Sequence, residues 1–463
     1  RNVQKTYTYF GRLSALKYTN IRFFETQNDD STRLNCYVML TKSKHKSISF
    51  ELEGTNSAGD LGAAASVSFQ HRNLFRGSET FMVKFRGAYE AISGLQPGYK
   101  NHNYTEYGVE TSINFPSFLF PFLTSDFKRR IRATTEFGLQ YNYQLRPEFS
   151  RTIASASWSY KWMQKQKIQH RIDLLDISYL YLPWISPQFQ EDYIDKDKDN
   201  YILRYNYENR LIVRMGYTYN YNSAGGTLVN NTITSNSYSI RAGFESAGNI
   251  LYGVSKMINM RKNKDGEYAI LGIPYAQYLK GDFDFAKNII IDHRNSLAFH
   301  AGIGVAIPYG NAKVVPFEKR YFSGGANSVR GWSVRNLGPG SFAGDGNFMN
   351  QSGDIKLDAS IEYRTRLFWK FRGAAFIDAG NIWTIREYEN QPGGAFEFDK
   401  FYKQIAVAYG LGLRLDLDFF VLRFDGGMKA VNPKYEKTKE RYPIIHPKFS
   451  RDFAFHFAVG YPF

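Results

Sequence analysis

The chain has 463 residues, of which 43% are hydrophobic and 17% aromatic, and its formal net charge is +16. Its mean hydropathy is −0.43, and no apolar run in the sequence approaches the ~18 residues of a membrane helix. A single cysteine, Cys36, excludes an internal disulfide. Lysines and arginines are spread along the chain and form no recognisable nucleic-acid module, so we expect no nucleic-acid partner.

The first 45 residues differ from the rest of the chain. Residues 4–16 predict a short helix, and 18–25 and 33–41 predict two strands separated by a polar turn at 27–31. The chain starts with Arg1, so we expect a start and any signal peptide to be absent from it. The order helix, strand, strand is typical of the end of a small α/β domain whose beginning is missing.

From residue 46 onward, apolar and polar residues alternate with a period of two. In residues 106–115, for example, Tyr107, Val109 and Ile113 share one face, opposite polar residues. Such alternation indicates strands with one face in an apolar medium and the other in a polar medium. The pattern predicts about sixteen strands, an even number as in bacterial outer-membrane barrels, at 47–54, 61–70, 81–89, 106–115, 132–145, 154–162, 170–182, 211–222, 238–245, 275–285, 297–307, 355–367, 371–380, 405–417, 422–430 and 453–463.

Two kinds of all-β protein suit this pattern. A soluble sandwich would bury its apolar faces against one another, whereas a membrane barrel would turn them to lipid. The many aromatic-rich faces favour lipid, and the connections alternate between short (73–78, 418–419) and long (309–347, 432–450), as in outer-membrane barrels. We therefore predict an all-β fold, a sixteen-stranded transmembrane antiparallel β-barrel over residues 46–463.

One glycine-rich stretch, 320–334, lies between two strongly alternating strands in the last third of the chain. A surface turn is the plain interpretation, and a phosphate-binding loop is poorly supported because no Gly-Lys-Ser/Thr follows. An arginine in the middle carries a planar, always-charged group that suits carboxylate partners. The part GGANSVRGW, called the loop motif below, contains Gly324, Gly325, Val329, Arg330, Gly331 and Trp332.

With these strands, the loop motif and an aromatic last strand, the chain resembles the BamA/TamA superfamily of outer-membrane assembly proteins. The resemblance covers nearly all of the chain and implies a partial POTRA-like periplasmic domain at 1–45 before the barrel at 46–463. Residues 409–417 and 425–429 look closer to TamA-like (TamL) members. The resemblance implies an outer-membrane protein in contact with lipid that inserts or translocates nascent outer-membrane or secreted proteins without a cofactor. It also allows a periplasmic TamB-like partner.

The resemblance further implies partners for the loop arginine. In that family the loop arginine folds into the lumen and meets acidic residues on neighbouring strands. Glu362 lies on the predicted polar face of 355–367, and Asp378 on that of 371–380, so both look like partners of Arg330. Ordinary lumen charges remain the alternative. Because the connection at 309–347 is long enough to fold inward, we expect a largely plugged pore.

The last strand, FAFHFAVGYPF, turns its aromatic side chains to one face. Its C-terminal phenylalanine looks like the signal by which outer-membrane proteins are recognised for insertion. Glycine permits a bend near the end, and proline lacks a backbone donor, which fits weak pairing with the first strand. We predict a seam between these two strands, formed by Ser47, Ser49, Gly54, Phe453, Gly460, Pro462 and Phe463.

An enzyme is not expected. The sequence contains no G-x-S-x-G and no H-E-x-x-H, and its eight histidines show no metal-ligand spacing, so we predict neither a catalytic nor a metal site. The main alternative to an assembly factor is a transport protein, either a two-partner secretion pore or a passive porin, because strand alternation alone indicates only the barrel.

Overall fold

The computed structural model describes residues 2–25, 34–57, 60–91, 103–191, 205, 207–224, 236–344, 350–417 and 420–463. The chain divides into two compact units, 1–162 with 172–185 and 163–171 with 186–463, and each is described by itself. The turn predicted at 27–31 and the short connection predicted at 418–419 lie outside the described residues.

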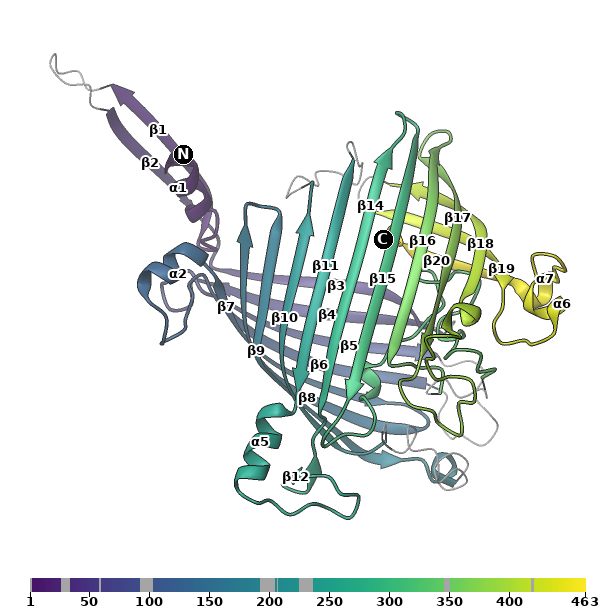
Figure 1. Cartoon of the computed structure of the whole chain (residues 1–463). Helices are drawn as coiled ribbons and strands as arrows, with labels where there is room; N and C mark the ends of the chain where they lie inside the picture. The colour runs from purple at the N-terminus through teal and green to yellow at the C-terminus, as the bar shows by residue number, and fades with distance from the viewer. Residues whose placement is uncertain are drawn as a thin grey trace. The chain divides into compact units, whose positions relative to one another are not determined.

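The first unit begins with a short helix and a two-stranded hairpin (Figure 1). Strands β1 and β2 pair antiparallel and form a sheet of their own. The following strands belong to the large sheet, with one helix in the connection between β6 and β7. The elements are α1 (Asn2–Phe10), β1 (Leu16–Glu25), β2 (Leu34–Lys42), β3 (Lys46–Ser57), β4 (Asp60–Arg72), β5 (Thr80–Ala91), β6 (Asn103–Phe115), α2 (Ser125–Ile131), β7 (Thr134–Leu145), β8 (Phe149–Gln164) and β9 (Ile168–Ile185), of which β8 and β9 extend into the second unit.

The second unit contains the remaining strands of the large sheet and several short helices in its connections. The connection between β15 and β16 holds the loop motif and is the longest in this unit. The elements are α3 (Pro187–Phe189), β10 (Arg210–Asn222), β11 (Ser237–Ala247), α5 (Asn249–Met257), β12 (Ala269–Ile270), β13 (Ile273–Pro274), β14 (Tyr278–Ile290), β15 (Asn295–Pro308), η2 (Phe317–Lys319), β16 (Ile355–Arg366), β17 (Phe371–Trp383), η3 (Phe401–Gln404), β18 (Ala406–Asp416), β19 (Val421–Val431), α6 (Thr438–Arg441), α7 (Phe449–Asp452) and β20 (Phe453–Val459).

The large sheet has sixteen strands in sequence order, from β3 at one end of the order to β20 at the other, with only the small β12–β13 hairpin set aside. Each of the sixteen predicted strands coincides with one of these, so the sixteen-stranded antiparallel prediction is confirmed. The register places polar positions side by side. Ser360 on β16 pairs with Asp378 on β17, and Arg414 on β18 pairs with Arg423 on β19.

In the large sheet, apolar side chains are exposed and charged side chains are buried, which is the reverse of the arrangement in a soluble protein. On β3, Ile48, Phe50 and Leu52 are 63%, 77% and 88% exposed. On β16, Glu362 is fully buried while its neighbour Tyr363 is 40% exposed. An exposed apolar surface along the strands is suited to lipid rather than water. The charged residues lie on the other face of the sheet.

Two predicted elements are shorter than the sequence suggested. The first helix ends at Phe10 instead of residue 16, because the N–H groups of Arg12 and Leu13 donate to the carbonyls three residues back, at 3.2 and 3.1 Å, and the α-helical pattern stops there. The last strand ends at Val459 instead of residue 463. There Gly460 adopts a left-handed backbone with φ +86°, a conformation that glycine adopts without strain. The residues after it therefore leave the strand.

Among the described residues, no helix is long and apolar enough to cross a membrane.

Candidate functional site

The loop motif forms a tight turn that depends on its two glycines. Gly324 and Gly325 have φ values of +93° and +95°, and a side chain on Gly324 would lie 2.3 Å from the Ser333 carbonyl oxygen. The Gly325 N–H donates to the Trp332 carbonyl at 2.8 Å, which closes the turn. This turn places the next residues against strands β16–β20.

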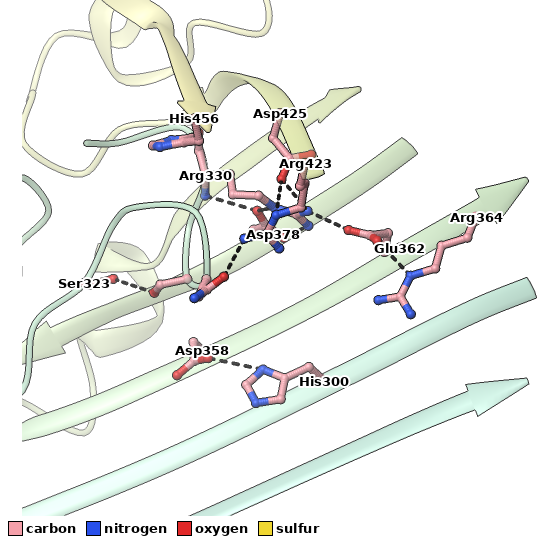
Figure 2. Close-up of polar contacts among 12 residues, drawn as sticks. His300, Ser323, Arg330, Asp358, Glu362, Arg364, Asp378, Arg423, Asp425 and His456 are labelled. Atoms are coloured by element: carbon pink, nitrogen blue, oxygen red, sulfur yellow. Dashed lines mark hydrogen bonds and ion pairs between the residues drawn. The ribbon is translucent and has the colours of Figure 1, made fainter. Parts of the chain in front are cut away.

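Arg330 is almost fully enclosed, with 1% of its side chain exposed. Its Nε and Nη2 donate to the two carboxylate oxygens of Asp378, each at 2.8 Å, and its backbone N–H donates to the same carboxylate at 3.1 Å. Its Nη1 donates to Glu362 Oε2 at 2.6 Å. The guanidinium also lies 3.5 Å from the centre of the Phe376 ring. The structure thus brings Arg330 together with both predicted partners (Figure 2).

The charge state of Arg330 follows from this environment. Burial lowers the pKa of Arg330, but the hydrogen bonds and negative charges of Asp378 and Glu362 outweigh burial and raise the pKa above its ordinary value. The guanidinium is therefore held as a permanent cation, and the bidentate geometry with Asp378 is the strongest that such a pair can adopt.

The predicted pair belongs to a larger ionic cluster. Glu362 also accepts from Arg364 at 2.8 Å and from Arg414 at 3.0 Å. Asp425 accepts from Arg414 at 2.7 Å and lies 3.3 Å from Arg423 Nε. The ionic cluster, as used below, consists of Arg330, Arg364, Arg414, Arg423, Glu362, Asp378 and Asp425.

Four cations and three carboxylates share this buried space. Arg414 and Arg423 lie directly opposite each other on paired strands, where like charges repel. Asp425 lies 2.7 Å from Arg414 and 3.3 Å from Arg423, so one carboxylate attracts both arginines and reduces their mutual repulsion. Removing a single acid would leave uncompensated positive charge in a buried site, which is costly. The cluster therefore fixes the loop to several strands together.

The apolar residues of the loop motif fill a second contact beside the cluster. Val329 and Trp332 are buried with Leu337 against Ala406 and Ala408 of β18. Lys429 Nζ lies 5.4 Å from the centre of the Trp332 ring. Trp332 thus packs against strand β18.

Close backbone approach explains the glycines at this contact. A side chain on Gly331 would lie 2.8 Å from the Cβ of Ala408, and one on Gly427 of β19 would lie 2.1 Å from the Arg330 carbonyl oxygen. Any side chain at Gly427 would have to displace the loop backbone, because the atom it meets belongs to the main chain.

The last strand is tied to the loop motif by one side chain. His456, on the polar face of β20 and 9% exposed, has its Nε2 3.0 Å from the Arg330 carbonyl oxygen (Figure 2). As the donor in this hydrogen bond, Nε2 must carry a proton. Arg330 therefore contacts β16 and β17 through its side chain and β20 through its backbone.

The end of the chain folds onto the polar face. The ring of Phe463 stacks on His300 of β15, with 5.3 Å between ring centres, and the Arg364 guanidinium lies 4.6 Å from the ring centre of Tyr461. His300 itself lies 3.3 Å from Asp358. The sequence placed Phe463 on the same face as Phe455 and Phe457, and the bend at Gly460 is the reason that this placement is wrong.

The residues predicted for the seam lie on β3 and at the end of the chain. Ser49 makes a 2.9 Å hydrogen bond with Ser68 on β4, and Ser47 lies 3.4 Å from Gln70 on the same strand, so both serines face the polar side. Gly54 pairs with Ala63. Phe453 begins β20 and stacks on Phe449 with 4.3 Å between ring centres. Gly460 and Pro462 follow the strand.

Five residues of the site, Arg364 of β16 and four on the last three strands, were missed in the sequence. Arg414, Arg423, Asp425 and His456 all lie on polar faces of the last three strands. Arg414 and Asp425 were inside segments noted only for their likeness to TamA-like members. The signal for Arg414 was present in the sequence, because it is the one arginine in β18, where apolar residues and glycines otherwise predominate.

Among the described residues, no group of three or more His, Cys, Asp or Glu could hold a metal ion.

Comparison with known proteins identifies the family. Residues 16–463 match the Omp85 superfamily domain. The chain belongs to the Omp85 superfamily. Members of this kind are outer-membrane β-barrels, and this Omp85 protein is an outer-membrane β-barrel. The outer membrane assembly factor BamA of Neisseria meningitidis serogroup B is 30% identical over 102 residues, which are 20% of this chain and 12% of that protein. The matched region is thus a small part of the relative.

Solved structures show the same fold. BamA from Haemophilus ducreyi lacking POTRA domains 1–3 aligns with a TM-score of 0.60 at 16% identity, covering 99% of this chain and 78% of that chain. CdiB from Escherichia coli aligns with a TM-score of 0.50 at 10% identity, covering 97% and 68%. At these identities the similarity concerns the fold alone, which this chain shares with BamA and with CdiB.

Proposed function

We propose that this Omp85 protein inserts or translocates nascent outer-membrane or secreted proteins, without covalent chemistry. The observation that supports this most is the connection from Arg330 to the last strand. The side chain of Arg330 is held by Asp378 and Glu362, and its carbonyl is held by His456 of β20. A passive pore does not need its terminal strand bound to an internal loop, whereas a protein that controls its terminal strand does.

The working site in this proposal is the seam between β3 and β20. An unpaired backbone group in lipid costs several kcal/mol, so an exposed strand edge would template pairing with another chain. The strand β3 has twelve residues and β20 has seven, so β20 can pair with only part of that edge. The rest of the β3 edge would be available to pair with a client strand. Depending on the register of β20, this free part lies near Gly54 or near Ser47.

The terminal residues support a weak seam from the other side. Gly460 bends the chain out of the strand, and Phe463 packs on His300 of the polar face instead of continuing β20. Pro462 has no N–H to donate in any register. Residues 460–463, about the last third of the predicted strand, are therefore not available for strand pairing.

The finer assignments of the sequence are also part of the proposal. We place residues 1–45, which fold as a helix and a hairpin, as the end of a POTRA-like periplasmic domain. Because residues 409–417 resemble TamA-like members, we favour a TamA-like role, with a periplasmic TamB-like partner. The clients would be recognised through their backbone at the seam, because strand pairing requires no particular side chain.

A folding assay tests the proposal. The full chain is reconstituted in phospholipid vesicles, and an unfolded eight-stranded outer-membrane barrel is added from urea. Folding of the probe is followed by its heat-dependent gel shift. We expect the reconstituted chain to accelerate folding relative to empty vesicles, and Arg330→Ala to lose most of the acceleration. The matched control, Arg294→Ala in the exposed turn between β14 and β15, should behave like the parent chain. Equal folding rates in loaded and empty vesicles would overturn the proposal.

A further inference from the structure

The connection between β6 and β7 is longer than a simple turn and is built onto the outer wall of the sheet. Thr135 of β7 is fully buried, and its hydroxyl donates to the Ser117 carbonyl at 2.8 Å and accepts from the Leu119 N–H at 2.9 Å. Tyr160 of β8 is 3% exposed and donates to the Leu119 carbonyl at 2.9 Å. The segment 117–120 therefore has a fixed place.

The two residues that hold the segment 117–120, Thr135 of β7 and Tyr160 of β8, lie on the apolar face of the sheet. Along β7, Thr135 has the same parity as Leu139 and Tyr141, which are 62% and 50% exposed. Along β8, Tyr160 pairs directly with Thr135, and Trp158 pairs with Phe137. Paired residues of an antiparallel ladder share a face. The segment thus covers the lipid-facing side of the sheet at one end of its strands.

An aromatic series runs from this wall out to an exposed tip. Ring centres are 5.9 Å apart between Trp158 and Tyr160, 6.3 Å between Tyr160 and Phe120, and 5.7 Å between Phe120 and Phe122. Phe122 is 87% exposed. An exposed phenylalanine on a segment that is itself anchored to the apolar face is placed to enter a membrane interface.

Helix α2 follows this tip and is basic. Thr124 caps its start, accepting the Phe127 N–H, and its last turn carries Lys128, Arg129 and Arg130. The side chains of these three cations form no hydrogen bond or ion pair within the described part of the chain. Figure 1 shows α2 beside the N-terminal segment, where Arg12 donates to the Arg132 carbonyl at 3.0 Å. Cations near the C-terminal end of a helix complement its dipole, and all three remain available to an anion.

An apolar groove lies on the same wall. It has a volume of about 520 Å³, and its lining includes Leu74 and Phe75 of the β4–β5 turn together with Phe81, Ile113, Phe137 and Trp158. The β4–β5 turn and the β6–β7 connection are at the same end of the strands, because β4 and β6 run in the same direction. Phe137 and Trp158 are in contact, with ring centres 5.5 Å apart, so the groove continues into the aromatic series.

We propose that this end of the barrel wall binds one phospholipid with an anionic headgroup, its phosphate on Lys128–Arg130 and an acyl chain in the apolar groove. Charge complementarity and continuity with the lipid-facing surface both select a lipid. Each cation near an anionic membrane surface contributes about 1 kcal/mol, which is roughly a fivefold change in affinity. The site does not depend on the seam or on the proposed function.

Native mass spectrometry of the full chain in detergent tests this site. The probes are dioleoylphosphatidylglycerol and dioleoylphosphatidylcholine, which share acyl chains and differ in net charge. We expect the anionic probe to bind at least tenfold tighter. Arg129→Gln with Arg130→Gln should lower its affinity roughly thirtyfold and weaken the zwitterionic probe much less, because the choline cation of that probe offsets its phosphate. The matched control, Lys437→Gln with Lys439→Gln at α6, should change neither.

Two further arms separate the groove from the charges. Ala156→Trp, on the groove floor, should weaken both lipids by a similar factor. Soluble glycerophosphate at the lipid concentration should not compete, and effective competition would mean a site for free phosphate. Equal affinity of the parent chain for both lipids, or an unchanged preference in Arg129→Gln with Arg130→Gln, would overturn the proposal. Folding of every variant is checked by its heat-dependent gel shift.

Discussion

Replacing Arg330 with alanine should release the loop motif from the strand wall. The substitution leaves Asp378, which is 1% exposed, with only the Arg330 backbone N–H at 3.1 Å. Glu362 keeps its bonds to Arg364 and Arg414, so the loss falls mainly on Asp378. Removing one partner of a buried ion pair costs about 3–5 kcal/mol, which lowers the loop-docking equilibrium by roughly 150- to 5,000-fold.

Hydrogen exchange measures this loss directly. The amides of Gly325 and Trp332 are bonded only within the docked turn, to the Trp332 and Val329 carbonyls. In Arg330→Ala their exchange should become faster by at least a hundredfold, while amides in the β16–β17 ladder exchange as before. Arg330→Lys keeps the charge but loses the bidentate geometry, so its effect should be intermediate. The matched control is Arg294→Ala.

Unchanged exchange in Arg330→Ala would show that the ion pairs of Arg330 do not hold the loop. That result would mean that the apolar contact of Val329 and Trp332 with β18 holds the loop without help from the ionic cluster.

Three further outcomes follow from the same contacts. Gly427→Ala should release the loop as fully as Arg330→Ala, because its Cβ would lie 2.1 Å from the Arg330 carbonyl oxygen; a docked loop in this variant, measured by exchange, would contradict the close approach. His456→Ala should cost about 1 kcal/mol and speed exchange in residues 453–459 but not in β18; equal protection would show that the bond does not hold the strand. In planar bilayers the parent chain should conduct little and Arg330→Ala should show large openings, whereas large steady conductance of the parent chain would favour a passive porin.

The sequence predicted the strands well because membrane strands obey a simple rule. Alternation with one face in lipid fixes both the position and the facing of each strand, and so Glu362 and Asp378 could be placed on polar faces. The pairing partner of a strand is its neighbour in sequence, which left little topology to resolve. The hypothesis that Arg330 meets these two acids therefore needed only the loop to fold inward.

The rest of the site depends on information that alternation does not contain. Arg414 and Asp425 come together through the register of β18 against β19, and His456 reaches the Arg330 carbonyl through the register of β20. Register is set by pairing across strands, and one sequence alone does not reveal it. The bend at Gly460 could not be distinguished from a continuing strand, because glycine permits both conformations.

The helix between β6 and β7 escaped for a different reason. Seven residues are too few for a clear helical period, and proline and phenylalanine precede them in an order that suits a loop equally well. Only the contacts of the preceding segment with Thr135 and Tyr160 show that this connection is part of the wall.

In the proposed function the seam between β3 and β20 must open for activity, and a disulfide across the seam would prevent this opening. With Cys36 replaced by serine, Ser49→Cys is combined in turn with Ala454→Cys and Ala458→Cys, which share the polar parity of His456 on β20. The control pair, Ser49→Cys with Ser68→Cys, locks two strands that are already directly paired.

Acceleration of probe-barrel folding in vesicles is then compared with and without reductant. We expect the oxidised seam pair to lose the acceleration, reduction to restore it, and the control pair to be active in both states. If the seam-locked protein folds the probe as fast as its reduced form, seam opening is not needed for activity.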